Sequence, residues 1–245
     1  MDTPSDSPVF TTLGLAPDLV DYRQALERQQ QLHSEVLAGT APSTVLLLEH
    51  ADVYTAGKRT EPEDLPRDDT PVIDVDRGGK LTWHGEGQLV VYPIIRLADR
   101  AAVKDYVCAL ERTVIDVLRR DYGIESTRVE GRSGVWITGD GPDRKIAAIG
   151  LRVHHSVTTH GLALNCSNDL APFDNIIACG ISDAGTTSIS AELGRTVSPA
   201  DILPALREQL AEELRPFLPG AAGPTATCDA TFQTSPDTPT IGAAR

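Results

Sequence analysis

The sequence predicts one α+β domain followed by a disordered tail, and three observations support this prediction. Residues 102–120 and 198–218 carry apolar side chains at helical spacing. The stretch between these two segments contains successive strand-like runs separated by turn residues. Residues 220–245 are rich in Ala, Thr, Pro and Gly and have little apolar surface to bury. No repeat or linker divides the rest, so we expect a flexible N-terminus at 1–11, a domain at 12–219 and a tail at 220–245.

The first third of the chain is expected to contain a helix and then strands. Residues 16–38 are rich in helix formers, and Gly39 is a plausible stop. Residues 43–50 read STVLLLEH, and this unbroken apolar run suits a strand that is buried on both faces. Further strands are expected at 72–76 and 88–95, on either side of a glycine-rich stretch and after a polar loop at 61–71.

The two amphipathic helices have clear apolar stripes. The stripe of the first is made of Val103, Val107, Leu110, Val114 and Val117/Leu118. The stripe of the second is made of Ile202, Leu206, Leu210 and Leu214. In the second helix Ser198 is a natural N-cap, Pro199 suits the first turn, and Asp201 favours the positive end of the helix dipole.

The middle of the chain is expected to form strands at 134–138, 145–154 and 157–165. The sequence GDGPDR between the first two favours a hairpin. In the second strand, the period of two places Ala147, Ile149, Leu151 and Val153 on one face.

Composition and charge exclude several classes of protein. The chain has a net charge of −13, but residues 58–152 hold 16 Lys/Arg against 17 Asp/Glu, so the flanks carry most of the negative charge. Nucleic acid and anionic membranes are therefore not expected partners. No apolar run approaches the roughly 20 residues that span a bilayer. The four cysteines lack CxxC spacing, so we expect a cytoplasmic protein with reduced thiols and no metal.

Three features could carry chemistry. Residues 77–88, RGGKLTWHGEGQ, match neither a P-loop nor a dinucleotide fingerprint. Their glycines indicate either tight turns or a wall that a ligand approaches closely. Cys179, which precedes a glycine, is either a packing residue or a nucleophile. Lys145 is either a solvated strand end or, if the fold brings it to a thiol, a group that favours the thiolate.

Successive motifs of the chain resemble those of the lipoyl(octanoyl) transferases. They are RGGKLTWHGEGQLVVYP, GRSGVWI, KIAAIGLRV, HGLALNC and CGISDAGTTSISAELG, with EHADVYTAGKR at 49–59 as a further block. Their order and spacing also match, including the nineteen positions from His160 to Cys179. The resemblance covers roughly residues 12–215 and is more specific than any single motif.

The resemblance implies a fold, a reaction and partners. The fold is that of the biotin and lipoate protein ligase catalytic domains, a mixed β-sheet flanked by helices. The reaction moves an octanoyl group from octanoyl-acyl carrier protein to a lysine of lipoyl domains, as the first step of lipoate biosynthesis, and needs no cofactor. The implied acceptors are the lipoyl domains of 2-oxoacid dehydrogenase complexes and the glycine cleavage H protein.

The resemblance also implies roles for residues of this chain. Cys179 would carry the acyl thioester, Lys145 would tune it, and His160 would have a positioning role. The implied acyl-binding residues are Arg77, Gly78, Gly79, Lys80, Leu81, Thr82, Trp83, His84, Ala148, Ile149, Gly150, Gly161, Leu162 and Ala163. The chain departs from the family at Glu86, where the family usually has a proline, and this puts the rigidity of the loop in doubt.

Two alternatives to the transferase stay open: an ATP-dependent lipoate or biotin protein ligase of the same fold, and a non-catalytic protein that binds acyl carriers. The implied carrier and acceptor are typically acidic, so basic residues of the centre form a candidate docking patch, although scattered solvated charges are an equal alternative. The candidates are Lys58, Arg59, Arg128, Arg132, Arg144 and Arg152.

Overall fold

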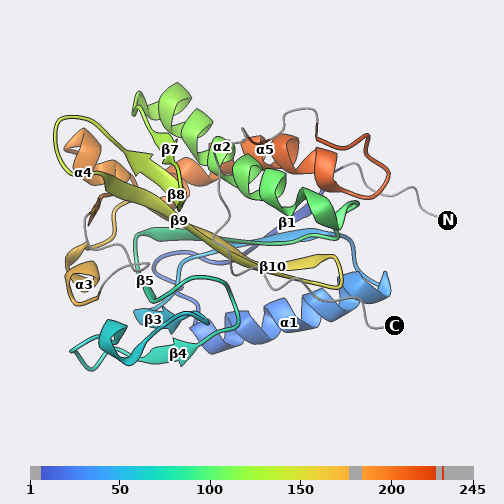
Figure 1. The fold of residues 1–245 in the computed structure, drawn as a ribbon, viewed down its shortest axis with the longest axis horizontal. Coiled ribbons are helices and arrows are strands. Elements are labelled where there is room, and N and C mark those ends of the chain that lie inside the picture. The colour runs from blue at the N-terminus through green and yellow to red at the C-terminus, as the bar shows by residue number, and fades with distance from the viewer. Residues whose placement is uncertain (1–6, 177–183, 225–227, 229–245) are drawn as a thin grey trace.

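A central mixed β-sheet organises the protein in the computed structural model, which describes residues 7–176, 184–224 and 228 (Figure 1). The strand order is β1-β2-β6-β10-β9-β8-β7, and β11 pairs with β9. The pairs β1–β2 and β9–β11 are parallel and the others are antiparallel. The bounds are β1 Val9–Gly14, β2 Thr44–Leu48, β6 Gln88–Ile94, β7 Thr127–Val129, β8 Arg132–Ile137, β9 Arg144–His154, β10 Val157–Asn165 and β11 Gly185–Thr186.

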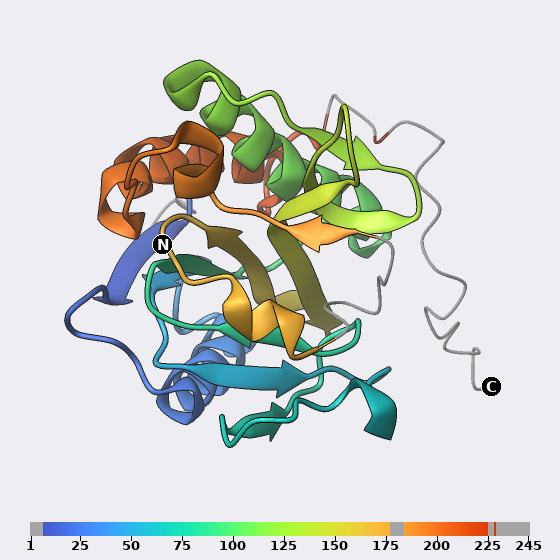
Figure 2. The ribbon, with the colours of Figure 1, turned by 90° about the vertical axis from the view of Figure 1, so that its left-hand side faces the viewer.

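Helices cover both faces of this sheet, as the sequence predicts. Helices α2 (Val103–Tyr122) and α5 (Pro199–Leu214) pack together on one face, and α1 (Tyr22–Ala38) packs on the other against β6 and β10. A second sheet lies on the α1 side (Figure 2), in the order β4 (Val72–Asp74), β3 (Val53–Ala56) and β5 (Thr82–His84). The remaining helical segments are α3 Ala171–Asp174, α4 Ile189–Leu193 and the 3₁₀ turns Pro62–Asp64, Arg100–Ala102 and Arg215–Phe217.

The strand β2 shows why an unbroken apolar run was needed. Val45 and Leu47 belong to the core beneath α2 and α5, whereas Leu46 and Leu48 belong to the core beneath α1. All five residues of β2 are buried. Because successive side chains of a strand point to opposite faces, a sheet covered on both sides requires apolar residues at every position.

The helix ends follow local capping rules. The Asp21 carboxylate accepts the N–H groups of Arg23 and Gln24, and Gly39 ends α1 in the left-handed conformation at φ 75°. Helix α1 therefore begins at Tyr22 and not at the predicted residue 16. Residues 16–18 form a turn instead, and Val20 forms a bridge to His50, with its N–H donating to the Glu49 carbonyl.

The end of α1 and the start of α5 confirm the predicted signals. Ser198 and Asp201 form a capping box at the start of α5, with Pro199 in its first turn. The stripe of α5 is fully buried, as predicted. In α2 the predicted stripe is fully buried at Leu110, Val114 and Val117/Leu118. Near the start of the helix Val103 and Val107 are only half-buried, and Tyr106 is buried instead.

Two expectations about the chain ends and thiols need correction. Strand β1 begins at Val9, inside the range predicted to be flexible, because Val9 pairs in parallel with β2 at Thr44. Cys108 and Cys228 form a disulfide, so the prediction of reduced thiols is wrong for this pair. The reason is that residue 228 lies against α2, where its N–H donates to the Asp105 carboxylate at 2.7 Å. Cys166 is free and buried.

The helices of the described ranges are too short or too polar to cross a lipid bilayer.

Candidate active site

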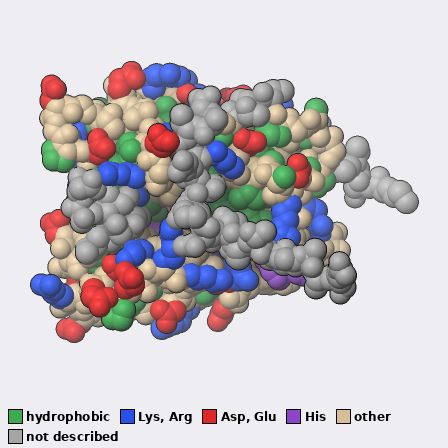
Figure 3. Space-filling view, in the orientation of Figure 1, with side chains coloured by type: hydrophobic (Ala, Val, Ile, Leu, Met, Phe, Trp, Pro, Cys, Tyr) green, Lys and Arg blue, Asp and Glu red, His purple; other side chains and the backbone are tan. Residues whose placement is uncertain are grey.

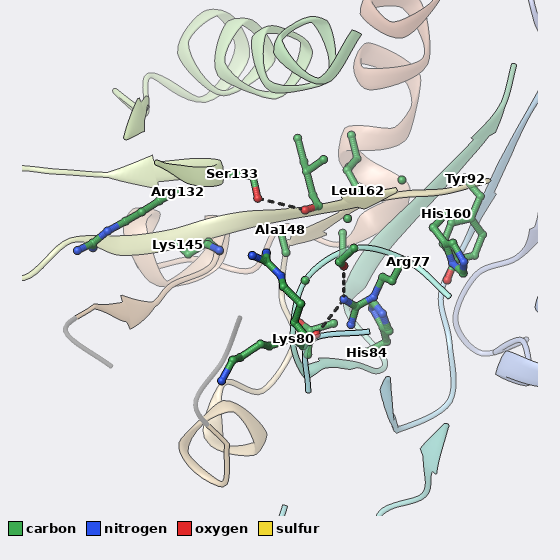
Figure 4. Close-up of a pocket in the computed structure, with 18 of the residues that line it drawn as sticks. Arg77, Lys80, His84, Tyr92, Arg132, Ser133, Lys145, Ala148, His160 and Leu162 are labelled. Carbon is green, nitrogen blue, oxygen red and sulfur yellow. Dashed lines mark hydrogen bonds between the residues drawn. The ribbon is translucent and has the colours of Figure 1, made fainter. Parts of the chain in front are cut away.

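A cleft of about 320 Å³ runs over β9 and β10 beneath the 77–80 loop. All of the predicted acyl-binding residues except Leu81 and Trp83 line it, and so do Lys145 and His160. Lys145, Ser133 and Arg132 lie at one end, Tyr92 and His160 lie at the other, and Arg77 and His84 lie between them (Figure 4). The described part of the chain therefore brings together residues from Tyr22 to Ala163, which are 141 positions apart in the sequence.

Leu81 and Trp83 do not line this cleft. They pack with Tyr54 and Phe173 in a separate small core, where the rings of Trp83 and Phe173 meet edge to face with centroids 5.6 Å apart. The cause is the alternation of β5, which turns Thr82 and His84 toward the cleft and their neighbours away from it.

Lys145 reaches the cleft because β9 carries one residue more than β8 at this point. The register pairs Val135 with Ala147 but Trp136 with Lys145, so Ile146 is the extra residue. Ile146 and Ala147 are consecutive, and both lie in the core under α2 and α5. Strict alternation would place Lys145 on the same side as Ala147, in that core. The irregularity turns its side chain to the cleft side, as β-bulges often do near active sites.

The side chain of Lys145 is enclosed but remains accessible to the cleft. It is 9% exposed, and its Nζ lies 4.6 Å from the centroid of the Trp136 ring. Cation–π contacts of this kind stabilise an ammonium. Lys145 also borders a second pocket of about 20 Å³, which Phe173 and Thr186 line with it.

Cys179, the predicted nucleophile, lies outside the described residues. The described residues on each side of it approach Lys145. Phe173 precedes Cys179 by six positions and lines the small pocket with Lys145. Thr186 follows it by seven positions and pairs with Lys145 in the sheet.

Arg77 acts as a brace within the cleft wall. Its Nη2 donates to the carbonyl and to the hydroxyl of Thr55, at 2.7 and 2.9 Å, and its Nη1 donates to the carbonyls of Gly78 and Lys80, each at 2.9 Å. These bonds tie the 77–80 loop to β3. A Cβ on Gly150 would lie 3.2 Å from Arg77 Cδ, so glycine lets the braced arm approach β9.

Lys80 contributes to the wall with its stem. Its ammonium pairs with Glu61 at 2.5 Å and with Asp64 at 3.0 Å, both in the polar 61–71 loop. The charge of Lys80 is thus already balanced by carboxylates of that loop.

The end of the cleft remote from Lys145 is built from neutral histidines and tyrosines. His84 Nδ1 donates to Gln88 Oε1 at 2.7 Å, and His50 Nε2 is 2.8 Å from the Tyr92 hydroxyl. Burial lowers the pKa of His84 to about 3 and that of His50 to about 4. Burial also raises the pKa of Tyr22 to about 12. At neutral pH this end is polar but carries no charge on these groups.

His160 is held in an unusual backbone conformation. Its φ is 58°, its N–H donates to Gln29 Oε1 at 2.8 Å, and its Nε2 lies 2.9 Å from Asp76 Oδ1. Burial, followed by Arg77 and Arg152, lowers the pKa of His160 to about 3. The neutral ring donates from Nε2 to Asp76, and the backbone N–H donates to Gln29. These two hydrogen bonds hold the residue in place. This arrangement fits a positioning role.

Several lining residues were not predicted from the sequence. They are Tyr22, Arg59, Thr186, Tyr92, Gly131, Arg132, Ser133, Gln88, Asn165 and Phe173. Tyr22 and Tyr92 lie in elements that the sequence does predict, but periodicity does not say which face of the sheet holds a site. In the part of the chain that the structure describes, no group of three or more His, Cys, Asp and Glu side chains is placed to hold a metal ion.

The helix-flanked mixed sheet, with a lysine at the mouth of a cleft between the two sheets, defines a catalytic domain of the lipoate and biotin protein ligase class. The family model for the lipoyl protein ligase A/B catalytic domain matches residues 21–211, and the chain belongs to this family. It is 60% identical over 208 residues to the octanoyltransferase of Arthrobacter sp. (strain FB24), which covers 84% of this chain and 91% of that relative.

Solved structures show the same fold at low sequence identity. A chain from the bipartite lipoate protein ligase and E2 lipoyl domain system of Thermoplasma acidophilum superimposes with a TM-score of 0.64 at 14% identity, covering 90% of this chain and 88% of that one. Biotin protein ligase from Aquifex aeolicus, in complex with biotin and ATP, has a TM-score of 0.55 at 13% identity, covering 84% and 70%. The fold class predicted from the sequence is confirmed.

Proposed function

We propose that this protein transfers an octanoyl group from octanoyl-acyl carrier protein to a lysine of a lipoyl domain, through a thioester on Cys179. The transfer of octanoyl in lipoate biosynthesis follows from the identity with the octanoyltransferases. The observation that carries the thioester route is the enclosed Lys145 at one end of the cleft, approached by the described residues on both sides of Cys179.

The chemistry needs a thiolate and a nearby proton carrier. The Cys179 thiolate attacks the thioester carbonyl, and the carrier thiol leaves with a proton from Lys145. The amine of the acceptor lysine then attacks the Cys179 thioester, Lys145 accepts the amine proton, and the Cys179 thiolate is released. The conversion of a thioester to an amide is downhill, so ATP is not consumed.

The cleft supplies the binding energy for the acyl chain. Burying six or seven methylenes at about 0.8 kcal/mol each contributes roughly 5 kcal/mol of gross attraction. Leu162 and Ile149 are apolar lining residues, while Gly150 and Gly161 let backbone form the wall. The neutral side chains of His84, Tyr22 and Tyr92 allow the chain to approach buried polar groups without having to desolvate an ion.

We propose that the two protein substrates dock on the basic side of the cleft mouth. Figure 3 shows several Lys and Arg side chains around the middle of the face that Figure 1 presents. Of the candidate docking residues, Arg59 and Arg132 line the cleft itself. Arg132, Arg144 and Arg152 each pair with a carboxylate of the same chain, namely Asp143, Glu192 and Asp76, so an acidic partner would have to compete with these pairs. The proposed acceptors are lipoyl domains of 2-oxoacid dehydrogenase complexes and the glycine cleavage H protein.

Intact-mass analysis tests the thioester route directly. After incubation with octanoyl-acyl carrier protein alone, the wild-type chain should gain the mass of one octanoyl group, and Cys179→Ser should not form the thioester or turn over. A matched Cys166→Ser variant controls for acylation of the other free thiol. Full activity of Cys179→Ser, or a requirement for ATP, would overturn the proposal and favour a ligase. Binding of the carrier without adduct or product would favour a non-catalytic protein.

A further inference from the structure

A buried glutamate lies beneath the hairpin that carries Lys145, and no step described above uses it. Glu111 lies on α2 among the apolar residues that pack against the sheet, and it is 0% exposed. Its Oε1 accepts the N–H of Gly134 at 2.9 Å. Its Oε2 has no hydrogen-bond partner among the described residues. A buried carboxyl group with an unpaired oxygen destabilises a fold, so its presence here points to a functional role.

Gly134 places the glutamate and the lysine on two sides of one strand. Gly134 has φ 113°, and a Cβ at this position would lie 2.4 Å from the Ala147 carbonyl oxygen and 3.5 Å from Lys145 Cε. The backbone of β8 thus separates the Glu111 carboxyl group from the stem of Lys145, with no side chain in between. One residue further along, the β8–β9 register shifts, and this shift turns Lys145 into the cleft. Glu111 supplies the acceptor for an N–H at the edge of that irregularity.

The charges around Glu111 come from three elements. Burial raises the pKa of Glu111 to about 7, while the Gly134 N–H and then Arg128, Lys145 and Arg112 act to lower it. Arg112 also bonds Glu213 at 2.8 Å, and Arg128 donates to Cys228 Sγ at 3.3 Å. Lys145 lies over the Trp136 ring. An ionised Glu111 therefore attracts the ammonium of Lys145 across the strand.

We propose that Glu111 is a positioning residue for the transfer reaction: it fixes the β8–β9 irregularity through Gly134 and stabilises Lys145 as an ammonium. This inference rests on the proposed function, in which Lys145 gives and takes protons. It adds a residue from the opposite side of the sheet, which does not touch the substrate.

The variant Glu111→Gln separates the two parts of this role, because its amide oxygen still accepts the Gly134 N–H while the charge is lost. We expect the ratio of the kcat/KM of the variant to that of wild type to fall as the pH rises through about 7, where Glu111 ionises. The loss relative to wild type should be several-fold at pH 8 and should vanish below pH 6, where Glu111 is protonated, with KM unchanged. Glu213→Gln, which removes a carboxylate on the same helical layer, should leave the profile in place. An unchanged profile for Glu111→Gln, or a loss equal at all pH values, would overturn the electrostatic role.

A titration of the wild-type protein covers the case in which the variant does not fold. With ¹³C-labelled lysine, the Cε resonance of Lys145, assigned by its absence in Lys145→Met, should show a step near pH 7, where Glu111 titrates. The absence of this step would contradict the inference.

Failure of the inference differs from failure of the proposed function. If Cys179→Ser and Lys145→Met keep full activity, the proposed function fails. If both lose activity while Glu111→Gln keeps the wild-type profile, only the role of Glu111 fails.

Discussion

Both ends of the cleft are buried, but the side chains at one end include a lysine and a carboxyl group, whereas neutral histidines lie toward the other. At one end Lys145 lies over an aromatic ring, with the carboxyl group of Glu111 behind the strand. Away from Lys145, His84 in the middle of the cleft and His50 behind the cleft wall have pKa values lowered by burial and are hydrogen-bonded as neutral rings. The comparison teaches that burial alone neutralises titratable groups, and that a buried ion persists where compensating groups surround it.

The largest expected effect is at the charged end. Lys145→Met should lower kcat/KM by about 10²–10⁴-fold, the range for loss of a proton-transferring side chain, while leaving the thermal unfolding temperature nearly unchanged. Lys104→Met, on α2, is the matched control and should stay near wild type. Single-turnover transfer of octanoyl to a lipoyl domain measures both. If Lys145→Met retains the wild-type rate and pH profile, the assignment of the lysine as proton carrier is wrong.

The second prediction concerns the pH dependence of the free energy of unfolding, to which the histidines and Glu111 contribute with opposite signs. The folded-state pKa values of His50, His84 and His160 lie below the ordinary 6.5, so their stabilisation is present above about pH 6.5 and is lost as the pH falls toward 4 and 3. The pKa of Glu111 is raised from 4.5 to about 7, so its stabilisation is present below pH 4.5 and is lost as the pH rises to 7.

The Glu111→Gln variant lacks the acid whose pH-dependent contribution to stability opposes that of the histidines. The variant should be more stable than wild type at pH 8 by roughly 3 kcal/mol, because a pKa unit corresponds to about 1.4 kcal/mol. Its stability should also fall more steeply than that of wild type between pH 6.5 and 4.5, since the opposing contribution of Glu111 is removed. Urea unfolding at several pH values measures both trends. Equal slopes for the two proteins would show that Glu111 is not buried as an acid.

A smaller effect concerns the wall between the two ends. A Cβ on Gly161 would lie 2.2 Å from the Val91 carbonyl oxygen, so Gly161→Ala should cost about 1–3 kcal/mol of stability. A Cβ on Gly150 would lie 3.2 Å from Arg77 Cδ, a much milder contact than that at Gly161, so Gly150→Ala should fold normally but narrow the cleft. We expect the latter to raise KM for octanoyl donors more than for butanoyl donors. Equal effects on both donors would mean that the acyl chain does not pass Gly150.

The smallest effect is at Glu86, where the family usually has proline. Its loop is already held, because the Gly87 N–H donates to Glu49 Oε2 at 2.7 Å and the Gly87 carbonyl accepts the N–H of Ser167 at 2.9 Å. Glu86→Pro should therefore change kcat/KM less than about twofold and raise stability by at most ~1 kcal/mol through the unfolded chain. A calorimetric scan with parallel kinetics checks this. A large gain in activity would show instead that the loop of the natural chain is too loose.

Local patterns predicted most of the longer elements, whereas the lining residues of the cleft were implied by the resemblance to the family. The stripe of α5, its capping box, the Gly39 stop and strand β10 at 157–165 all follow from spacing and end signals, and the structure confirms them. Motif order identified the family. Short strands such as β3 and β5 were not predicted, because three or four residues carry too little periodicity and gain their stability from pairing with each other.

What the sequence determined by itself is most of the longer elements, the fold class and the family, since helix stripes, caps and motif spacing are properties of neighbouring residues. The tertiary structure decided which faces meet. A strict period of two would have placed Lys145 with Ala147 in the core, and one extra residue in β9 turned it to the cleft. Glu111 stands at helical spacing from Val114 and Leu118, so its burial was readable in principle. Its place behind Lys145 follows only from the packing of α2 on β8, because that contact joins residues distant in the chain.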